Sequence, residues 1–109
     1  VMIIMELYDK GSLLDLISYR RSRKLRVFND ELIISITKQI FTACAYLHSL
    51  NIIHKDMHPD NIMIDYYQGD DLKVRVVDFG IAQEKIEGFP LKFNFNEDSV
   101  NFWAPEVVK

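Results

Sequence analysis

The sequence predicts an α+β chain that is mostly helical and carries one β-hairpin with polar residues at its open end. Two observations predict this class. Apolar residues recur at three- and four-residue spacing between Leu32 and Leu47, which is the period of an amphipathic helix. Two β-rich runs, 62–64 and 74–77, flank a turn-forming segment at 66–71, which is typical of a hairpin. Helix and hairpin patterns thus follow one another in a chain of 109 residues.

Composition limits the classes of protein to consider. A hydrophobic content of 49% indicates a folded body, or part of a larger one, and a net charge of −3 argues against nucleic-acid binding. No apolar run approaches the roughly 20 residues of a membrane span. The single Cys44 excludes an internal disulfide and is interpreted as a small core residue. We therefore expect an intracellular, cytoplasmic location.

The beginning of the chain is predicted to be a buried strand. Residues 1–5 form an unbroken apolar run, and no initiator Met stands at position 1, which suggests part of a longer chain. Polar, turn-like residues follow from Glu6 to Gly11. Ser12 can cap a short helix. Its apolar residues are Leu13, Leu14, Leu16 and Ile17.

A basic stretch comes next. Five of the seven residues from Arg20 to Arg26 are Lys or Arg. One interpretation is a solvated linker between helices. The other is a docking patch for an acidic partner or a lipid head group.

The longest helix is expected to begin near residue 30 and to end near residue 50. Asn29 or Asp30 can accept hydrogen bonds from the free N–H groups at its start. If Asn29 is the cap, Phe28 and Ile33 occupy the positions of a hydrophobic staple. Asn51 tolerates the left-handed conformation that often ends a helix.

Polar residues cluster where the hairpin opens. A short strand at Ile52-Ile53 leads into the polar run 54–61, and a long loop is expected over 81–102. Antiparallel pairing of 62–65 with 74–77 would bring Asn61 and Asp78 side by side. Their amide and carboxylate oxygens are hard ligands of the kind that Mg²⁺ shares with phosphates and water. Asp56 stands five residues before Asn61 and can accept the proton of an attacking hydroxyl.

Three motifs carry a family resemblance. Residues 54–61 read HKDMHPDN, residues 78–80 read DFG, and residues 104–106 read APE. Their order and spacing resemble the eukaryotic-type protein kinases over essentially the whole chain. The resemblance implies a partial protein-kinase-like fold. Residues 1–11 would be the last strand of the N-lobe and the hinge, and residues 12–109 would be the helical C-lobe up to the A-P-E segment.

The resemblance also implies the roles of several residues. Asp56 would be the catalytic base, and Asn61 and Asp78 would hold Mg²⁺ in a reaction that uses ATP. Backbone groups of Glu6 and Tyr8 would bind adenine. The expected nucleotide contacts also include Ser12, Met63 and Asp78, and the expected packing pair is His54 with Phe79.

Ser99 bears on the class of substrate. It stands five residues before Ala104, where Ser/Thr kinases usually carry a Thr that bonds the catalytic Asp. The resemblance therefore favours the Ser/Thr and tyrosine-kinase-like groups of protein kinases over true tyrosine kinases, although an ordinary loop serine is an open alternative. Between Gly80 and Ala104, Ser99 is the only hydroxyl residue.

Two departures from the family pattern affect the expected regulation. Lys55 replaces an Arg that grips a loop phosphate, so we expect activation without loop phosphorylation, with Glu97 or Asp98 pairing with Lys55. His58 replaces a catalytic-loop Lys and is retained as a candidate catalytic residue. The pair His58-Pro59 also resembles small-molecule kinases of the aminoglycoside and choline type.

A non-catalytic interpretation is the second alternative. The 109 residues include no Gly-rich phosphate loop and no strand Lys for the α- and β-phosphates. They could therefore act as a kinase remnant that binds or regulates, and we expect no turnover of ATP by this chain alone.

Overall fold

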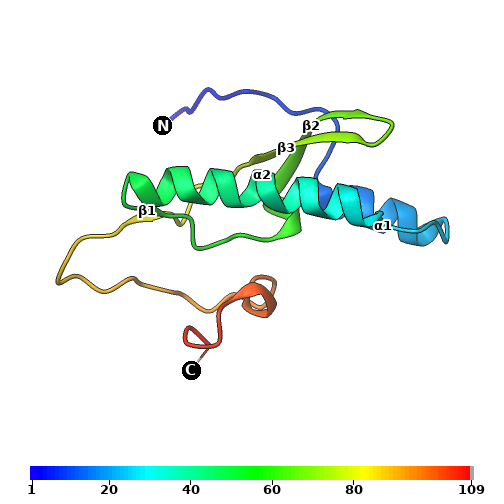
Figure 1. Ribbon diagram of the computed structural model, residues 1–109. Coiled ribbons are helices and arrows are strands. Elements are labelled where there is room, and N and C mark those ends of the chain that lie inside the picture. The colour runs from blue at the N-terminus through cyan, green and yellow to red at the C-terminus, as the bar shows by residue number, and fades with distance from the viewer. Residues whose placement is uncertain (109) are drawn as a thin grey trace.

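The computed structural model describes residues 1–108. In chain order the elements are α1 (Leu13–Ser22), α2 (Asp30–Ser49), β1 (Ile52–Ile53), η1 (Pro59–Asn61), β2 (Ile62–Gln68), β3 (Asp71–Val76), β4 (Gln83–Glu84) and η2 (Val100–Phe102). The long α2 crosses the middle of the molecule beside the β2–β3 hairpin, and the C-terminal part lies on the opposite side of α2 from the hairpin (Figure 1). This is a partial protein-kinase-like α+β fold.

The predicted start of α1 is confirmed. Ser12 Oγ accepts a hydrogen bond from the backbone N–H of Asp15, and the Asp15 carboxylate accepts one from Ser12 N–H. This reciprocal capping box satisfies two of the free donors at the helix start. The helix runs further than expected and includes Arg20 and Arg21, because basic side chains favour the negative end of the helix dipole.

The predicted bounds of α2 are also confirmed. Asn29 is the N-cap, and its Oδ1 accepts a 2.8 Å hydrogen bond from Leu32 N–H. Asn51 follows the helix with a φ of 58°. Phe28 packs against the core, whereas Ile33 is 47% exposed, so the proposed staple between them stays a prediction.

The hairpin is longer than the sequence suggested. Strand β2 pairs antiparallel with β3, as expected, but a β-bulge between Ile64 and Tyr66 shifts the register by one residue, so that Ile62 lies opposite Val76 and not Val77. The strands continue through the predicted loop as far as Gln68 and Asp71, and only Gly69 and Asp70 make the turn. The extension follows because Gly69 adopts a φ of 59°, which suits a two-residue turn.

One buried cluster joins the helices to the hairpin. It combines residues of α1, α2, β2 and β3, and Leu72 is the most buried at 1% exposure. Gln39 on α2 reinforces this contact, because its side chain donates to Leu72 O and accepts from Val74 N–H. The other members are Leu13, Leu32, Ile36, Ile62, Ile64 and Val74.

The expectation of a buried strand at residues 1–5 is wrong. Residues 1–5 have no strand pairing, and the side chains from Val1 to Met5 are at least 74% exposed. An apolar run becomes a strand only where another strand pairs with its backbone. Within residues 1–108 the strand pairings join only β1 to β4 and β2 to β3.

The expected loop over 81–102 contains two short elements. Strand β4 pairs antiparallel with β1, with Ile53 opposite Gln83, and η2 follows at Val100–Phe102. Periodicity could not reveal β4, because two residues are too few to show a pattern. In the described part of the chain, no helix is long and apolar enough to cross a membrane.

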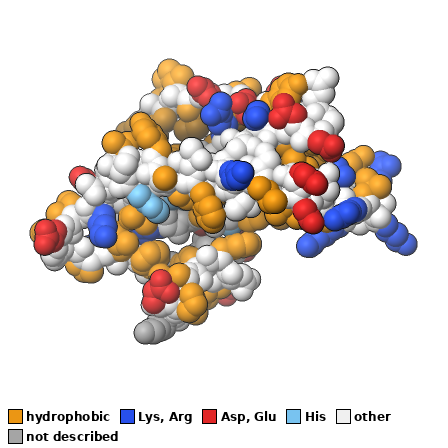
Figure 2. Space-filling model, in the orientation of Figure 1, with side chains coloured by type: hydrophobic (Ala, Val, Ile, Leu, Met, Phe, Trp, Pro, Cys, Tyr) orange, Lys and Arg blue, Asp and Glu red, His pale blue; other side chains and the backbone are white. Residues whose placement is uncertain are grey.

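The basic stretch lies at the end of the molecule where α1 ends, and Lys and Arg side chains gather there (Figure 2). Arg20 donates to Arg26 O and to the hydroxyl of Tyr67, and Arg26 forms an exposed ion pair with Asp30 at 3.8 Å. The stretch is therefore partly the last turn of α1 and partly the connection to α2. Its role as a docking patch stays a prediction.

Candidate active site

The polar loop 54–61 surrounds the carboxylate of Asp56. Ser99 Oγ donates a 2.7 Å hydrogen bond to Asp56 Oδ1, and Asn61 Nδ2 donates a 3.0 Å bond to Oδ2. Asn61 Nδ2 also lies 2.9 Å from the Asp56 carbonyl oxygen. The structure therefore brings together three candidate residues from two segments, the polar loop and the far end of the 81–102 loop.

His58 lies on the same carboxylate. Its Nε2 is 3.2 Å from Asp56 Oδ1 and 3.2 Å from Asn61 Nδ2, and the side chains of His58 and Asp56 are each 15% exposed. The His58 ring also lies 5.6 Å from the ring of Phe102 in η2. All four predicted catalytic residues, Asp56, His58, Asn61 and Ser99, thus share one small polar cluster.

His54 is a buried packing residue that supports the polar loop 54–61. It is 3% exposed, and its ring meets that of Phe79 edge to face at 5.0 Å, as expected. The backbone N–H of Asp56 donates to His54 Nδ1, so Nε2 carries the proton and donates to Val77 O at 2.7 Å. A neutral, buried His54 therefore links the polar loop to the end of β3.

Asp78 directly follows the hairpin. Val77 N–H donates to Asn61 O at 2.9 Å, so the backbones at Asn61 and Asp78 are neighbours, as the hairpin predicts. Asp78 adopts a φ of 62°, which is uncommon outside glycine, and its Oδ1 accepts from Gly80 N–H at 3.1 Å. This conformation leaves Oδ2 of Asp78 without a protein donor in the described chain.

A cavity of about 750 Å³ opens beside Asp78. Its other lining residues include Met5, Glu6 and Tyr8 from the predicted hinge, and Phe79 and Gly80 from the D-F-G motif. A hydrogen bond from its hydroxyl to Glu6 raises the pKa of Tyr8. The predicted adenine-binding segment and the predicted metal ligand thus line the same cavity.

Two predicted nucleotide contacts do not line that cavity. Ser12 is 3% exposed and used in capping α1, and its hydroxyl donates to Asp60 at 3.4 Å. Met63 is on β2, where it bridges to Ser12, while the next residue, Ile64, donates to Gly11 O. The structure therefore connects Ser12 and Met63 to each other, and their contact with a nucleotide stays a prediction.

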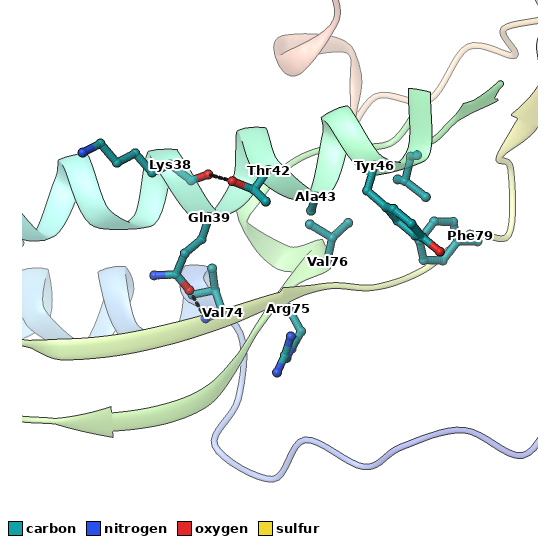
Figure 3. Close-up of a pocket in the computed structure, with 10 residues that line it drawn as sticks. Lys38, Gln39, Thr42, Ala43, Tyr46, Val74, Arg75, Val76 and Phe79 are labelled. Carbon is teal, nitrogen blue, oxygen red and sulfur yellow. Dashed lines mark hydrogen bonds between the residues drawn. The ribbon is translucent and has the colours of Figure 1, made fainter. Parts of the chain in front are cut away.

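A second hollow, of about 540 Å³, lies between α2 and β3 (Figure 3). Tyr46 and Phe79 lie at one end, and Gln39 lies at the other with its hydrogen bond to Val74. None of the residues that line it carries a carboxylate, and none comes from the polar loop 54–61. It is therefore separate from the catalytic cluster.

The predicted ion pair of Lys55 with Glu97 or Asp98 is wrong. Lys55 forms no ion pair with Glu97 or Asp98; instead its Nζ donates to Gln83 Oε1 at 3.2 Å. Gln83 is nearer because β4 pairs with β1, which places position 83 beside the loop that follows β1. Sequence reasoning missed Gln83, since a lone glutamine in a predicted loop carries no pattern.

Comparison with known proteins identifies the family of this chain. The family model of the protein kinase domain matches residues 1–109, and the chain belongs to that family. Curated relatives agree. The chain is 38% identical over 105 residues to the probable serine/threonine-protein kinase fhkA of Dictyostelium discoideum, which is 96% of this chain and 17% of the relative.

Two further relatives extend the comparison. Calcium-dependent protein kinase 6 of Plasmodium berghei is 38% identical over 98% of this chain, which corresponds to 7% of the relative. Human death-associated protein kinase 2 is 33% identical over 99% of this chain and 27% of the relative. The chain therefore spans between 7% and 27% of the length of these three relatives.

Proposed function

We propose that the protein that carries this chain transfers the γ-phosphate of ATP to Ser or Thr hydroxyls of protein substrates. One observation carries the proposal: both oxygens of the Asp56 carboxylate are fixed, Oδ1 by Ser99 and Oδ2 by Asn61. The family membership and the printed names of the Ser/Thr kinase relatives support the same function.

Asp56 is the proposed base. A carboxylate oxygen can accept two hydrogen bonds, and Oδ2 accepts only that of Asn61 among the side-chain contacts of residues 1–108. One lone pair therefore remains to receive the proton of a substrate hydroxyl. Ser99 and Asn61 hold the carboxylate in one orientation, which is the positioning on which such transfer depends.

Asn61 and Asp78 are the proposed Mg²⁺ ligands. The Asn61 amide nitrogen is occupied by Asp56, whereas its Oδ1 accepts no hydrogen bond within the described residues. A free amide oxygen and a free carboxylate oxygen fit a hard cation that takes its other ligands from phosphates and water. Among residues 1–108, no group of three or more His, Cys, Asp or Glu side chains could form a metal site from protein ligands alone. The bound ion would neutralise charge on the phosphates.

The preference for Ser and Thr rests on Ser99. Ser99 is 3% exposed, and its hydroxyl bonds to Asp56, which is the contact that the resemblance to Ser/Thr kinases implies. An ordinary loop serine would be free of the catalytic loop. The buried bond therefore supports the Ser/Thr class and a protein substrate.

The test is a phosphate-transfer assay on the purified protein from the complete reading frame, with Mg-ATP and a mixture of Ser/Thr and Tyr peptides. Asp56→Asn is expected to lower turnover by about 10²-fold or more, because proton transfer is lost. Asp71→Asn is the matched control, since Asp71 is exposed at the start of β3 and, among residues 1–108, forms an ion pair only with Lys73.

Three outcomes discriminate among the alternatives. Transfer to Ser/Thr peptides that depends on Asp56 supports the proposal. Transfer to an aminoglycoside or choline, but not to peptides, would favour a small-molecule kinase. Binding of Mg-ATP without any transfer would favour the non-catalytic binding module.

A further inference from the structure

Gln83 connects three separate points of the chain through one side chain. Its Oε1 accepts from Lys55 Nζ at 3.2 Å and from Lys92 N–H at 3.0 Å, and its Nε2 donates to Pro90 O at 3.3 Å. Both lone pairs of the oxygen are therefore used. A carboxamide can make this set of contacts because it carries an acceptor and donors on the same group.

The residue that Gln83 holds is next to the proposed base. Lys55 precedes Asp56 and adopts a φ of 72°, a conformation that side-chain-bearing residues rarely adopt without outside contacts. A second contact comes from Phe93, whose ring centroid lies 5.2 Å from Lys55 Nζ. Phe93 in turn meets Trp103 edge to face at 5.9 Å. Gln83 and Phe93 thus attach the loop beyond β4 to the backbone that carries Asp56.

No exposed hydroxyl in this loop could provide a phosphate for Lys55. Ser99 is the only hydroxyl residue between Gly80 and Ala104, and it is buried against Asp56. Lys55 Nζ already donates a hydrogen bond to the neutral side-chain amide of Gln83. The contacts that order the loop are therefore present in the unmodified chain.

We propose that Gln83 is a positioning residue that holds the loop 85–103 against the catalytic loop, so that Ser99 stays within hydrogen-bonding distance of Asp56 without covalent modification. Only the kinetic consequence rests on the proposed kinase function. The effect on the loop itself can be measured without any turnover.

The direct test is amide hydrogen exchange on the purified, unphosphorylated protein. Gln83→Met keeps the length of the side chain and removes its hydrogen bonds. Exchange at the Lys92 amide and across 85–93 is expected to rise about tenfold or more. Gln83→Glu keeps the acceptor for Lys55 and for the Lys92 amide and loses only the donor to Pro90 O, so exchange is expected to stay within about threefold of wild type. Gln68→Met is the matched control at the exposed end of β2.

Turnover provides the second readout. Gln83→Met is expected to lower kcat about tenfold with little change in KM for ATP, because Gln83 lines no part of the 750 Å³ cavity. Gln83→Glu should restore most of the loss. A merely structural glutamine would lower stability and both kinetic constants together, with no rescue by Glu.

The outcomes are separable. Unchanged exchange across 85–93 in Gln83→Met would overturn the proposal, whatever the activity. Faster exchange in a protein that shows no phosphate transfer would uphold the role of Gln83 and reject the kinase function instead.

If Gln83→Met does not fold, Lys55→Met removes the same contact from the other side and must also speed exchange across 85–93. A requirement for a phosphate on Ser99 to order this loop, seen by mass spectrometry with exchange, would contradict the proposal.

Discussion

Ser99 Oγ lies 2.7 Å from Asp56 Oδ1, a hydrogen bond between residues that are 43 positions apart in the chain. The bond joins the loop before the A-P-E segment to the residue proposed as the base. Because both partners are largely buried, the bond is protected from competition with water. Its geometry links the position of the loop to the orientation of the carboxylate.

This contact predicts the behaviour of two substitutions. Ser99→Ala removes a hydrogen bond to a charged group, which typically contributes about 1.5–3 kcal/mol, so kcat should fall by about tenfold to a hundredfold. Ser99→Thr keeps the hydroxyl and should retain most of the activity. Steady-state kinetics with a Ser/Thr peptide measure both. Equal losses in the two variants would show that the hydroxyl does not act through Asp56.

Asn61 is expected to determine the requirement for magnesium. Asn61→Ala removes the free amide oxygen and also the two hydrogen bonds to Asp56. The concentration of Mg²⁺ needed for half-maximal turnover should rise about tenfold or more, and kcat should fall. A magnesium titration measures this, with the exposed Asn101→Ala as control. An unchanged magnesium requirement would exclude Asn61 as a ligand.

Leu72 is expected to be the most sensitive core position. It is 1% exposed on β3, and Gln39 fixes its backbone carbonyl at 2.8 Å. Leu72→Ala should lower the free energy of unfolding by about 2–5 kcal/mol, because it leaves a cavity between α2 and the hairpin. Urea denaturation measures the change. Ile34→Ala is the control, since Ile34 is 53% exposed and should cost far less.

Cys44 is expected to react slowly with thiol reagents. Partial burial raises the pKa of its thiol above the ordinary value. The reactive thiolate is therefore scarcer at neutral pH than in the unfolded chain, and alkylation should speed up as the pH rises toward that raised pKa. The rate of iodoacetamide labelling from pH 7 to pH 10, compared with the protein in urea, measures this. Equal rates in both states at pH 7 would contradict it.

The same shift has a consequence for stability. A thiol whose pKa is higher in the folded state favours folding while it stays protonated. Its contribution is complete below the unfolded pKa and is lost as the pH rises through the folded pKa. Comparison of wild type with Cys44→Ala across this range isolates the contribution of the thiol.

Local chemistry made several features predictable. Asn29 begins α2 because its side chain accepts an N–H that the helix cannot satisfy, and Asn51 ends it because it tolerates a positive φ. The two β-rich runs on either side of a turn-forming segment predicted the antiparallel hairpin, although the bulge after Ile64 shifts its register by one residue. These signals depend on residues that are close in sequence, so they survive without knowledge of the rest of the chain.

Contacts between distant segments were not predictable in the same way. The run 1–5 has the composition of a strand, but a strand needs a partner that composition cannot supply. The charge of Lys55 suggested an acidic partner at Glu97 or Asp98, yet the pairing of β1 with β4 brings the neutral Gln83 closer.

The sequence by itself determined the helix caps, the antiparallel hairpin and the residues that can donate, accept or bind a cation, because these follow from side-chain chemistry and short-range spacing. Only the tertiary structure decided which of them meet. The bond between Asp56 and Ser99 and the contact of Lys55 with Gln83 both depend on how the loop beyond β4 returns to the catalytic loop. That return is set by packing and strand pairing across the whole chain, which no local pattern records.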